Sequence, residues 1–262
     1  MEQSKLKLSI LMPVRNEGLN ISIMLKILKS MVDVPHEVLI VYDDPDDNCV
    51  GIVNDLKSHY PSLRPVRNII GRGVVNAIKA GVSASAGEYI LLFAVDEVGP
   101  ILAIEDMIKL MDEGCDMVSC TRYAYGGRRL GGSLIGGALS RAANMLFTFF
   151  SGAAFSDGTT GIKMFRKELF DKITVESNPV GWAVVFEMII KAQVLGMKIG
   201  EVPIISIDRL YGGESTFILG PWFREYLRWF FWGIKNLRGR PGVQKTVVRI
   251  PLNLDRKRGC RI

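Results

Sequence analysis

The chain has 262 residues, 48% of them hydrophobic, and carries a formal net charge of +6. This length and composition predict one domain with a substantial core and a C-terminal appendage, and no stretch reaches the roughly 18 uninterrupted apolar residues of a membrane-spanning helix. Residues 1–5 run straight into an apolar segment without a signal-peptide pattern, so we expect a protein that stays on the cytoplasmic side.

Apolar runs and amphipathic segments alternate along the first half of the chain. In order, they predict a strand at 8–13, a helix at 19–31, a strand at 37–42, a helix at 49–60, a short strand at 65–68, a helix at 74–85, a strand at 89–93, a helix at 101–113 and a strand at 116–120. Such alternation implies right-handed βαβ crossovers. We therefore predict an α/β fold with a mostly parallel, Rossmann-like sheet flanked by helices.

The tetrapeptide Ala94-Val95-Asp96-Glu97 follows the predicted strand 89–93. In open α/β sheets, ligands bind at the carboxyl ends of strands. Carboxylates at this place suit a divalent cation that bridges two phosphates, although a single acid at a strand end is more often just the start of a turn. A metal site would be expected to carry a further carboxylate, and Ala94 occupies one of the places for it.

Polar loops follow the first two predicted strands. Residues 13–17 read Pro-Val-Arg-Asn-Glu, and residues 43–48 contain four aspartates. Such an acidic cluster repels phosphate but accepts hydrogen bonds from a base or ribose, so we expect it to hold a nucleoside unless it is only a solvated turn. Gly71-Arg72-Gly73 precedes a helix, and its amides either approach a ligand or simply form the turn that enters the helix.

Residues 221–237 predict an amphipathic helix that contains three of the four tryptophans. Its apolar side chains share one side and its basic side chains another, as shown by Trp222, Tyr226, Phe230, Ile234 and Leu237 against Arg224, Arg228 and Lys235. Residues 238–262 then hold eight Lys or Arg and one acid, which leaves 25 basic and 26 acidic residues in 1–237. This composition indicates an interfacial membrane helix with a basic tail, and the alternative is packing on its own domain or on a second subunit. We therefore divide the chain into 1–219 and a membrane-associating unit, 220–262.

Four segments, taken together in their order and spacing, resemble the inverting glycosyltransferases of family 2, which have the GT-A fold. They are residues 13–17, 43–44, 71–73 with 86–90, and 94–96. The second half of the chain is similar to the dolichyl- and polyprenyl-phosphate mannose or glucose synthases. The similar segments are residues 140–144, 157–166 and 186–188, and a last segment that begins at 201–204, includes Arg209 and ends at 212–215. The resemblance covers roughly residues 8–215.

The resemblance implies roles for individual positions. Those that match the nucleoside-binding segments are Pro13, Arg15, Glu17 and Asp44, and we add Gly71 and Gly73 to this nucleotide-binding set. Asp96 matches the second aspartate of the D-x-D motif, which holds Mg²⁺ or Mn²⁺ against the diphosphate, and Glu97 would assist it. The remaining matches are Arg122 and Arg209 at the phosphates, and Asp157 and Glu187 near the sugar; Arg128, Arg129 and Ser215 are further candidates for binding the acceptor phosphate.

The sequence departs from the family pattern at several of these positions. Ala94 replaces the first D-x-D aspartate, and Val98 replaces a polar residue that often helps to bind the metal. Ser215-Thr216 and Ile162-Lys163 stand where Ser-Lys and Phe-Arg are usual. Weakened metal binding, an altered donor and loss of catalysis are the three consequences left open.

The resemblance implies an inverting hexosyltransferase that uses a GDP- or UDP-linked sugar and a dolichyl or undecaprenyl phosphate. We expect it to act peripherally at the cytoplasmic membrane face through residues 221–262, with no nucleic-acid partner, and we leave a homo-oligomer open. A lipid phosphate is already an anion and needs positioning by Arg122, Arg128, Arg129 or Arg209. A sugar hydroxyl needs a general base, and Asp157 is the candidate for that role.

Two other functions compete with lipid-phosphate transfer. One is a family 2 glycosyltransferase that acts on a sugar hydroxyl in cell-surface glycan synthesis. The other is a non-catalytic nucleotide-sugar binder whose metal motif has degraded at Ala94.

Overall fold

The computed structural model describes residues 6–131, 134–207 and 219–249. Eight strands in these ranges form one sheet: β1 (Leu8–Pro13), β2 (His36–Tyr42), β3 (Leu63–Arg67), β4 (Tyr89–Leu92), β5 (Met117–Thr121), β7 (Lys163–Arg166), β8 (Ile199–Pro203) and β10 (Lys245–Val247). Their order is β10-β8-β5-β7-β4-β1-β2-β3, and β7 alone in this sheet runs antiparallel to its neighbours. A small parallel sheet pairs β6 (Arg128–Leu130) with β9 (Ile205–Ile207).

Helices cover both faces of the large sheet. One core lies under α1 (Gly18–Met31), α2 (Asn48–Leu56) and α4 (Ile104–Asp112), and the other under α3 (Val74–Ala84), α6 (Lys167–Ile173), α7 (Ala183–Val194) and α8 (Leu219–Leu237). Successive side chains of β1 enter opposite cores, since Ile10 and Met12 join the first and Leu11 the second. A strand covered on both faces must be apolar along its whole length, which explains the unbroken hydrophobic runs in the sequence.

The predicted elements of the first half are confirmed, with shifts at their ends. The largest shift is in the helix predicted at 49–60, which ends at Leu56. The helix predicted from 101 begins instead as a 3₁₀ turn, η1 (Gly99–Ala103), which leads into α4. The prediction of a mostly parallel sheet is confirmed, but the antiparallel strand β7 was not predicted, because buried Lys163 interrupts its apolar pattern.

The strand order reverses beside β1. The chain proceeds from β1 to β2 and β3 on one side and then places β4 on the other side of β1. At such a reversal the loops that leave the two central strands diverge, and they open a crevice at the carboxyl edge. The loops concerned are residues 13–17 after β1 and 93–98 after β4.

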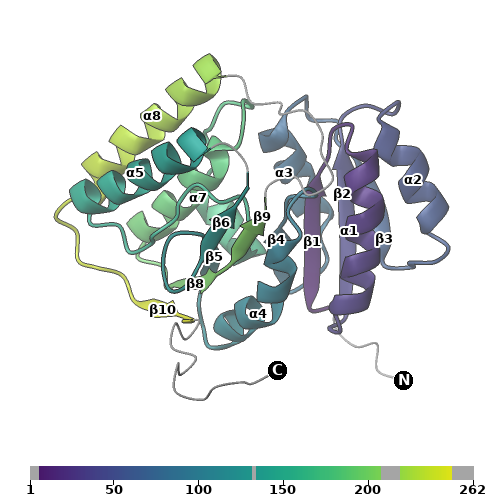
Figure 1. Ribbon diagram of the computed structural model, residues 1–262, viewed down its shortest axis with the longest axis horizontal. Coiled ribbons are helices and arrows are strands. Elements are labelled where there is room, and N and C mark those ends of the chain that lie inside the picture. The colour runs from purple at the N-terminus through teal and green to yellow at the C-terminus, as the bar shows by residue number, and fades with distance from the viewer. Residues whose placement is uncertain (1–5, 132–133, 208–218, 250–262) are drawn as a thin grey trace, which may run out of the picture.

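The amphipathic helix predicted at 221–237 is confirmed as α8, and it packs on α7 and on α5 (Leu134–Ser151). Figure 1 shows these three helices together at the end of the molecule opposite α1 and α2. The inward side of α8 is centred on Trp229, which is 1% exposed, and Leu237 belongs to the same core. After α8 the chain returns as β10 and pairs with β8. None of the described helices is both long enough and apolar enough to cross a lipid bilayer.

Replacing Trp229 by alanine should test whether α8 is part of the folded core. We expect Trp229→Ala to lower the free energy of unfolding by about 3–5 kcal/mol, because a buried indole is lost and a cavity remains. Phe231→Ala, two residues away and 64% exposed, should change it by less than about 0.5 kcal/mol. Urea denaturation of both variants measures the difference, and equal effects would contradict this packing.

Candidate active site

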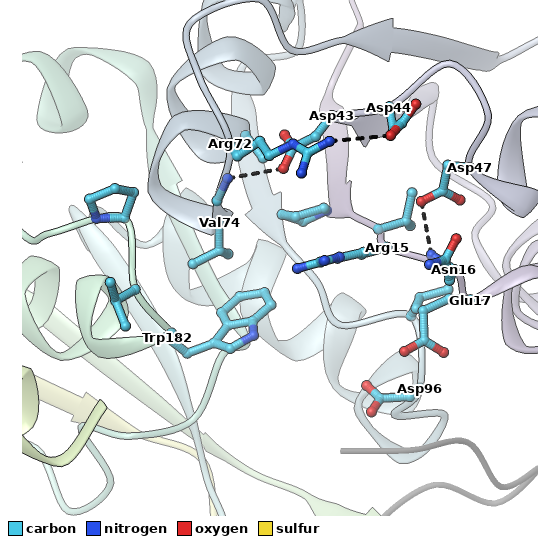
Figure 2. Close-up of a pocket in the computed structure, with 18 of the residues that line it drawn as sticks. Arg15, Asn16, Glu17, Asp43, Asp44, Asp47, Arg72, Val74, Asp96 and Trp182 are labelled. Atoms are coloured by element: carbon cyan, nitrogen blue, oxygen red, sulfur yellow. Dashed lines mark hydrogen bonds and ion pairs between the residues drawn. The ribbon is translucent and has the colours of Figure 1, made fainter. Parts of the chain in front are cut away.

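A cavity of about 680 Å³ opens at the carboxyl edge of β1, β2 and β4. Its lining comes from the loop after β1, the aspartates after β2, the entry to α3, the loop after β4, the loop before α7, and the first turns of α8. Figure 2 shows Arg15, Glu17, Asp44 and Asp96 around this cavity, with Trp182 on its other side. The strand reversal therefore brings together segments that are far apart in the sequence.

Three of the four aspartates after β2 divide into two roles. Asp47 caps α2 by accepting a hydrogen bond from the Cys49 N–H at 2.8 Å, and it also accepts the Asn16 N–H at 2.8 Å. Asp43 accepts hydrogen bonds from the Asn68 amide at 2.7 Å and from the Gly73 N–H at 2.9 Å. These two carboxylates join loops through one hydrogen bond at each oxygen, and both also line the cavity. Asp44 is half-exposed and remains a nucleoside-binding candidate.

The glycines before α3 have structural tasks that differ from the expected ligand contact. Gly73 has a φ of +109°, and a Cβ there would lie 2.4 Å from the Pro179 carbonyl oxygen. Its N–H is already used by Asp43. Gly71 lies outside the cavity lining, and its carbonyl accepts a hydrogen bond from Asn68. The glycines thus permit a turn and a close packing contact; the Gly73 N–H is occupied, and Gly71 lies outside the cavity lining.

Asp96 and Glu97 face different surroundings. Asp96 lines the cavity, and Figure 2 places its carboxylate near that of Glu17. Glu97 does not line it and instead accepts a hydrogen bond from Ser206 on β9 at 3.3 Å. Within the described ranges, no three His, Cys, Asp or Glu side chains gather as a ready-made metal site. The residues still fit Mg²⁺ or Mn²⁺ through Asp96, because diphosphate oxygens and waters can complete the shell of such a cation.

Arg122 and Asp157 bind each other rather than lining the cavity. The Arg122 Nε and Nη2 atoms donate to the two oxygens of the Asp157 carboxylate at 2.7 and 2.9 Å, and Nη2 also reaches Thr159. Asp157 is fully buried, and Arg122 is 11% exposed. The sequence predicted Arg122 at the phosphates and Asp157 near the sugar as separate groups, and the structure pairs them as a bidentate ion pair.

This pairing bears on the proposed general base. Burial alone would raise the pKa of Asp157, but the charge and hydrogen bonds of Arg122 outweigh burial and lower that pKa below its usual range. An efficient base needs a pKa near the working pH and a lone pair aimed at substrate. Asp157 has neither, because its oxygens are occupied by Arg122 and Thr159.

The remaining predicted phosphate ligands are not assembled at the cavity. Arg128 and Arg129 lie on β6, and neither lines it. Arg129 approaches α5, since a Cβ on Gly137 would lie 3.3 Å from its Nη1 atom. Arg209 and Ser215 fall outside the described residues, so their roles stay predictions. The predicted site residues that the fold does gather at the cavity are Pro13, Arg15, Glu17, Asp44, Gly73 and Asp96.

The sequence did not predict the aromatic side of the cavity. Pro179, Val180, Gly181 and Trp182 come from a loop without periodicity, and Trp222 was interpreted as part of a membrane-facing helix. The nearest sequence signal is the pair Gly181-Trp182 directly before α7. This pair indicates a tight turn with an aromatic side chain but gives no sign of what that side chain faces.

Replacing Asp157 by asparagine separates a structural role from a catalytic one. We expect Asp157→Asn to lower the unfolding free energy by about 3 kcal/mol, because the Arg122 charge stays buried without its counter-ion. Asp44→Asn removes an exposed ion pair with Arg72 but keeps an oxygen for the Asp46 N–H, and it should change this free energy by less than about 0.5 kcal/mol. Urea denaturation is the measurement. Unchanged stability with loss of turnover would instead identify Asp157 as a catalytic group.

Curated relatives resemble this chain over most of its length. The dolichol-phosphate mannosyltransferase of Pyrococcus furiosus is 26% identical over 226 residues, which cover 85% of this chain and 62% of that relative. The dolichyl-phosphate hexose transferase of Haloferax volcanii is 28% identical over 212 residues, covering 79% and 85% respectively. An undecaprenyl-phosphate 4-deoxy-4-formamido-L-arabinose transferase of Yersinia enterocolitica is 25% identical, and the match spans half of its length.

Solved structures give the fold. The glucosyl-3-phosphoglycerate synthase of Mycobacterium tuberculosis, crystallised with Mn²⁺, UDP and glucosyl-3-phosphoglycerate, superposes with a TM-score of 0.65 at 16% identity. The superposition covers 87% of this chain and 80% of that one, and it confirms the predicted GT-A fold. The model of the family described as "Glycosyl transferase family 2" matches residues 9–174, well over half of the chain. The protein therefore belongs to glycosyl transferase family 2.

Proposed function

We propose that this protein transfers a hexose from a nucleoside-diphosphate sugar to a polyprenyl phosphate. The observation that carries this choice of acceptor is the Arg122–Asp157 ion pair. It occupies and keeps ionised the carboxylate that would have deprotonated a sugar hydroxyl. A phosphate acceptor needs no base, because it is an anion near neutral pH. The names of the polyprenyl-phosphate relatives support the same choice.

The site residues have distinct tasks in such a transfer. Arg15, Glu17 and Asp44 line the part of the cavity assigned to the nucleoside. Asp96 would hold Mg²⁺ or Mn²⁺, which when bound would supply positive charge to stabilise the leaving diphosphate. An acceptor phosphate oxygen attacks the anomeric carbon from the side opposite the leaving oxygen. The new carbon–oxygen bond forms as the bond to the diphosphate breaks, and the nucleoside diphosphate leaves with the electron pair.

The outer surface of α5 and α8 supports a membrane location for this reaction. Large apolar side chains exposed there are Leu134, Leu139, Met145, Leu146, Phe149 and Phe150 on α5, and Phe223 and Phe231 on α8. The exposed charged residues of the two helices are all basic, since the lone acid, Glu225, is buried. A broad apolar face with a basic border suits an anionic bilayer surface. The tryptophans of α8 are turned partly or wholly inward, so we assign this contact chiefly to α5, with residues 220–262 contributing to it.

The proposed role of Asp96 in stabilising the donor's leaving group is tested by comparing Asp96 with its neighbour Glu97. We expect Asp96→Asn to lower Mn²⁺-dependent release of nucleoside diphosphate by about 100-fold or more, because charge stabilisation at the leaving group is lost. Glu97→Gln should retain most activity, since Glu97 faces β9. The assay combines UDP- and GDP-hexoses with undecaprenyl or dolichyl phosphate, and with free sugars as alternative acceptors. Release with sugars but not with lipid phosphate would overturn the acceptor, and donor binding without any transfer would overturn catalysis.

The membrane contact is tested on vesicles. We expect Leu146→Ser combined with Phe149→Ser to reduce co-sedimentation with phosphatidylglycerol vesicles by about tenfold, because two exposed apolar side chains no longer enter the interface. Leu19→Ser combined with Leu102→Ser makes a matched control, since these leucines are as exposed but lie elsewhere. Equal losses in both double variants would argue against α5 as the contact.

A further inference from the structure

One side of the active-site cavity is aromatic and carries no charge. It consists of Pro179, Val180, Gly181 and Trp182 from the loop before α7, with Trp222 from α8. We call these five residues the aromatic wall. Figure 2 shows Trp182 across the cavity from Asp44 and Asp47, on the same side as Val74, with the Arg15 side chain extending towards it. The cavity therefore has an acidic and basic side contributed by β1, β2 and α3, and a neutral side contributed by the C-terminal half.

Close packing builds the aromatic wall. Gly181 has a φ of +66°, and a Cβ there would lie 2.4 Å from Cδ2 and 2.6 Å from Cε2 of Trp222. The Trp222 ring thus lies directly on the Gly181 backbone, an approach that a side chain at 181 would prevent. On the other side, the Pro179 carbonyl oxygen sits against Gly73 at the start of α3. The loop is held between α3 and α8.

Two buried carboxylates fix the chain that leads into the aromatic wall. Glu225 of α8, 5% exposed, accepts hydrogen bonds from the backbone N–H and the side-chain amide of Asn178 at 3.0 and 2.8 Å. Glu187 of α7, fully buried, accepts the N–H groups of Glu176 and Ser177 at 2.6 and 2.8 Å. Charge-assisted hydrogen bonds to buried carboxylates are among the strong ones, so this loop is a preorganised surface.

The position and chemistry of the aromatic wall indicate which part of the substrates contacts it. A neutral wall offers no positive charge to a diphosphate, which leaves the nucleoside, the hexose and the lipid chain as candidates. The nucleoside is accounted for by the opposite side of the cavity. The hexose is joined to the diphosphate through its anomeric carbon, and so it must lie next to the group that Asp96 serves. Trp182 lines the same cavity as Asp96, on the side that carries no charge, and is therefore the aromatic side chain available to the hexose.

We propose that Trp182 and Trp222 form the subsite for the hexose ring of the donor, with the C–H face of the sugar against the Trp182 indole. This inference rests on the proposed nucleoside-diphosphate sugar donor and specifies where its sugar binds. Glu225 is then a positioning residue, because it holds the loop that presents Trp182 and touches no substrate itself. The same geometry makes α8 part of the donor site.

The test compares a nucleotide with its own sugar conjugate. Calorimetric titrations in Mn²⁺ would use UDP against UDP-glucose and GDP against GDP-mannose, on wild type, Trp182→Phe and Trp182→Ala. For whichever pair binds, we expect Trp182→Ala to lower the affinity for the sugar nucleotide by about tenfold relative to the affinity for the free nucleotide. This is the loss typical of one aromatic contact. Trp182→Phe should lose less. Trp232→Phe is the matched control, since Trp232 lies on α8 outside the cavity lining and should change neither ligand.

Other outcomes would overturn the subsite in recognisable ways. Equal weakening of nucleotide and sugar nucleotide would assign the wall to the base. Unchanged donor affinities with a raised KM for polyprenyl phosphate would assign it to the lipid. If wild type binds none of the four ligands, the proposed donor class itself fails, and the subsite with it.

The positioning role of Glu225 has its own readout. Glu225→Ala should reproduce the selective loss of sugar-nucleotide affinity, whereas Glu225→Gln, which keeps an acceptor for the Asn178 N–H, should restore most of it. A loss in the alanine variant that affects nucleotide and sugar nucleotide alike would mark Glu225 as a merely structural residue.

Discussion

The buried ion pair between Arg122 and Asp157 is the interaction on which the second half of the fold depends. It joins the end of β5 to the segment that enters β7, the strand inserted antiparallel between β4 and β5. The preceding residue, Ser156, donates its backbone N–H and its hydroxyl to Glu201 on β8, and Glu201 in turn pairs with Lys245 on β10 at 2.6 Å. Since a buried charge is tolerated only when it is paired, these contacts fix the relative positions of four strands.

The same network limits the chemistry that the site can perform. Lys163 on β7 is fully buried with its ammonium on the Ser119 hydroxyl, and burial lowers its pKa to about 8. The charges around Asp157 are thus cationic at neutral pH and hold that carboxylate ionised and occupied. A nucleophile that arrives already ionised is compatible with such a site, whereas one that must lose a proton finds no acceptor in Asp157. The acceptor that we propose would thus be favoured by the packing of the core.

The sequence predicts the structure of the first half of the chain far better than that of the second half. Long apolar runs such as 8–13 and 89–93 identify central strands, and the acids at their ends, including Asp96, fall at the cavity because strand ends converge there. Asp43 and Asp157 show the limit of this reasoning, since a ligand-binding carboxylate and one that pairs with its own protein have the same sequence signature. The strand β7 was hidden by Lys163, whose burial depends on partners distant in the chain. Trp182 was hidden because a loop has no periodicity to show what it faces.

The C-terminal helix connects the two functions that the fold must combine. One side of α8 carries Trp222 into the cavity and holds Asn178 through Glu225, while Phe223 and Phe231 of the same helix are exposed. The sequence predicted a membrane-associating appendage from the tryptophans, yet it is the phenylalanines that face outward and the indoles that pack inward. If α5 and α8 rest on a bilayer, the aromatic wall proposed to receive the donor sugar is anchored to the same helix that meets the lipid surface. A soluble donor and a membrane-bound acceptor can then meet at one rigid element, because no hinge separates the cavity from the membrane-facing side of α8.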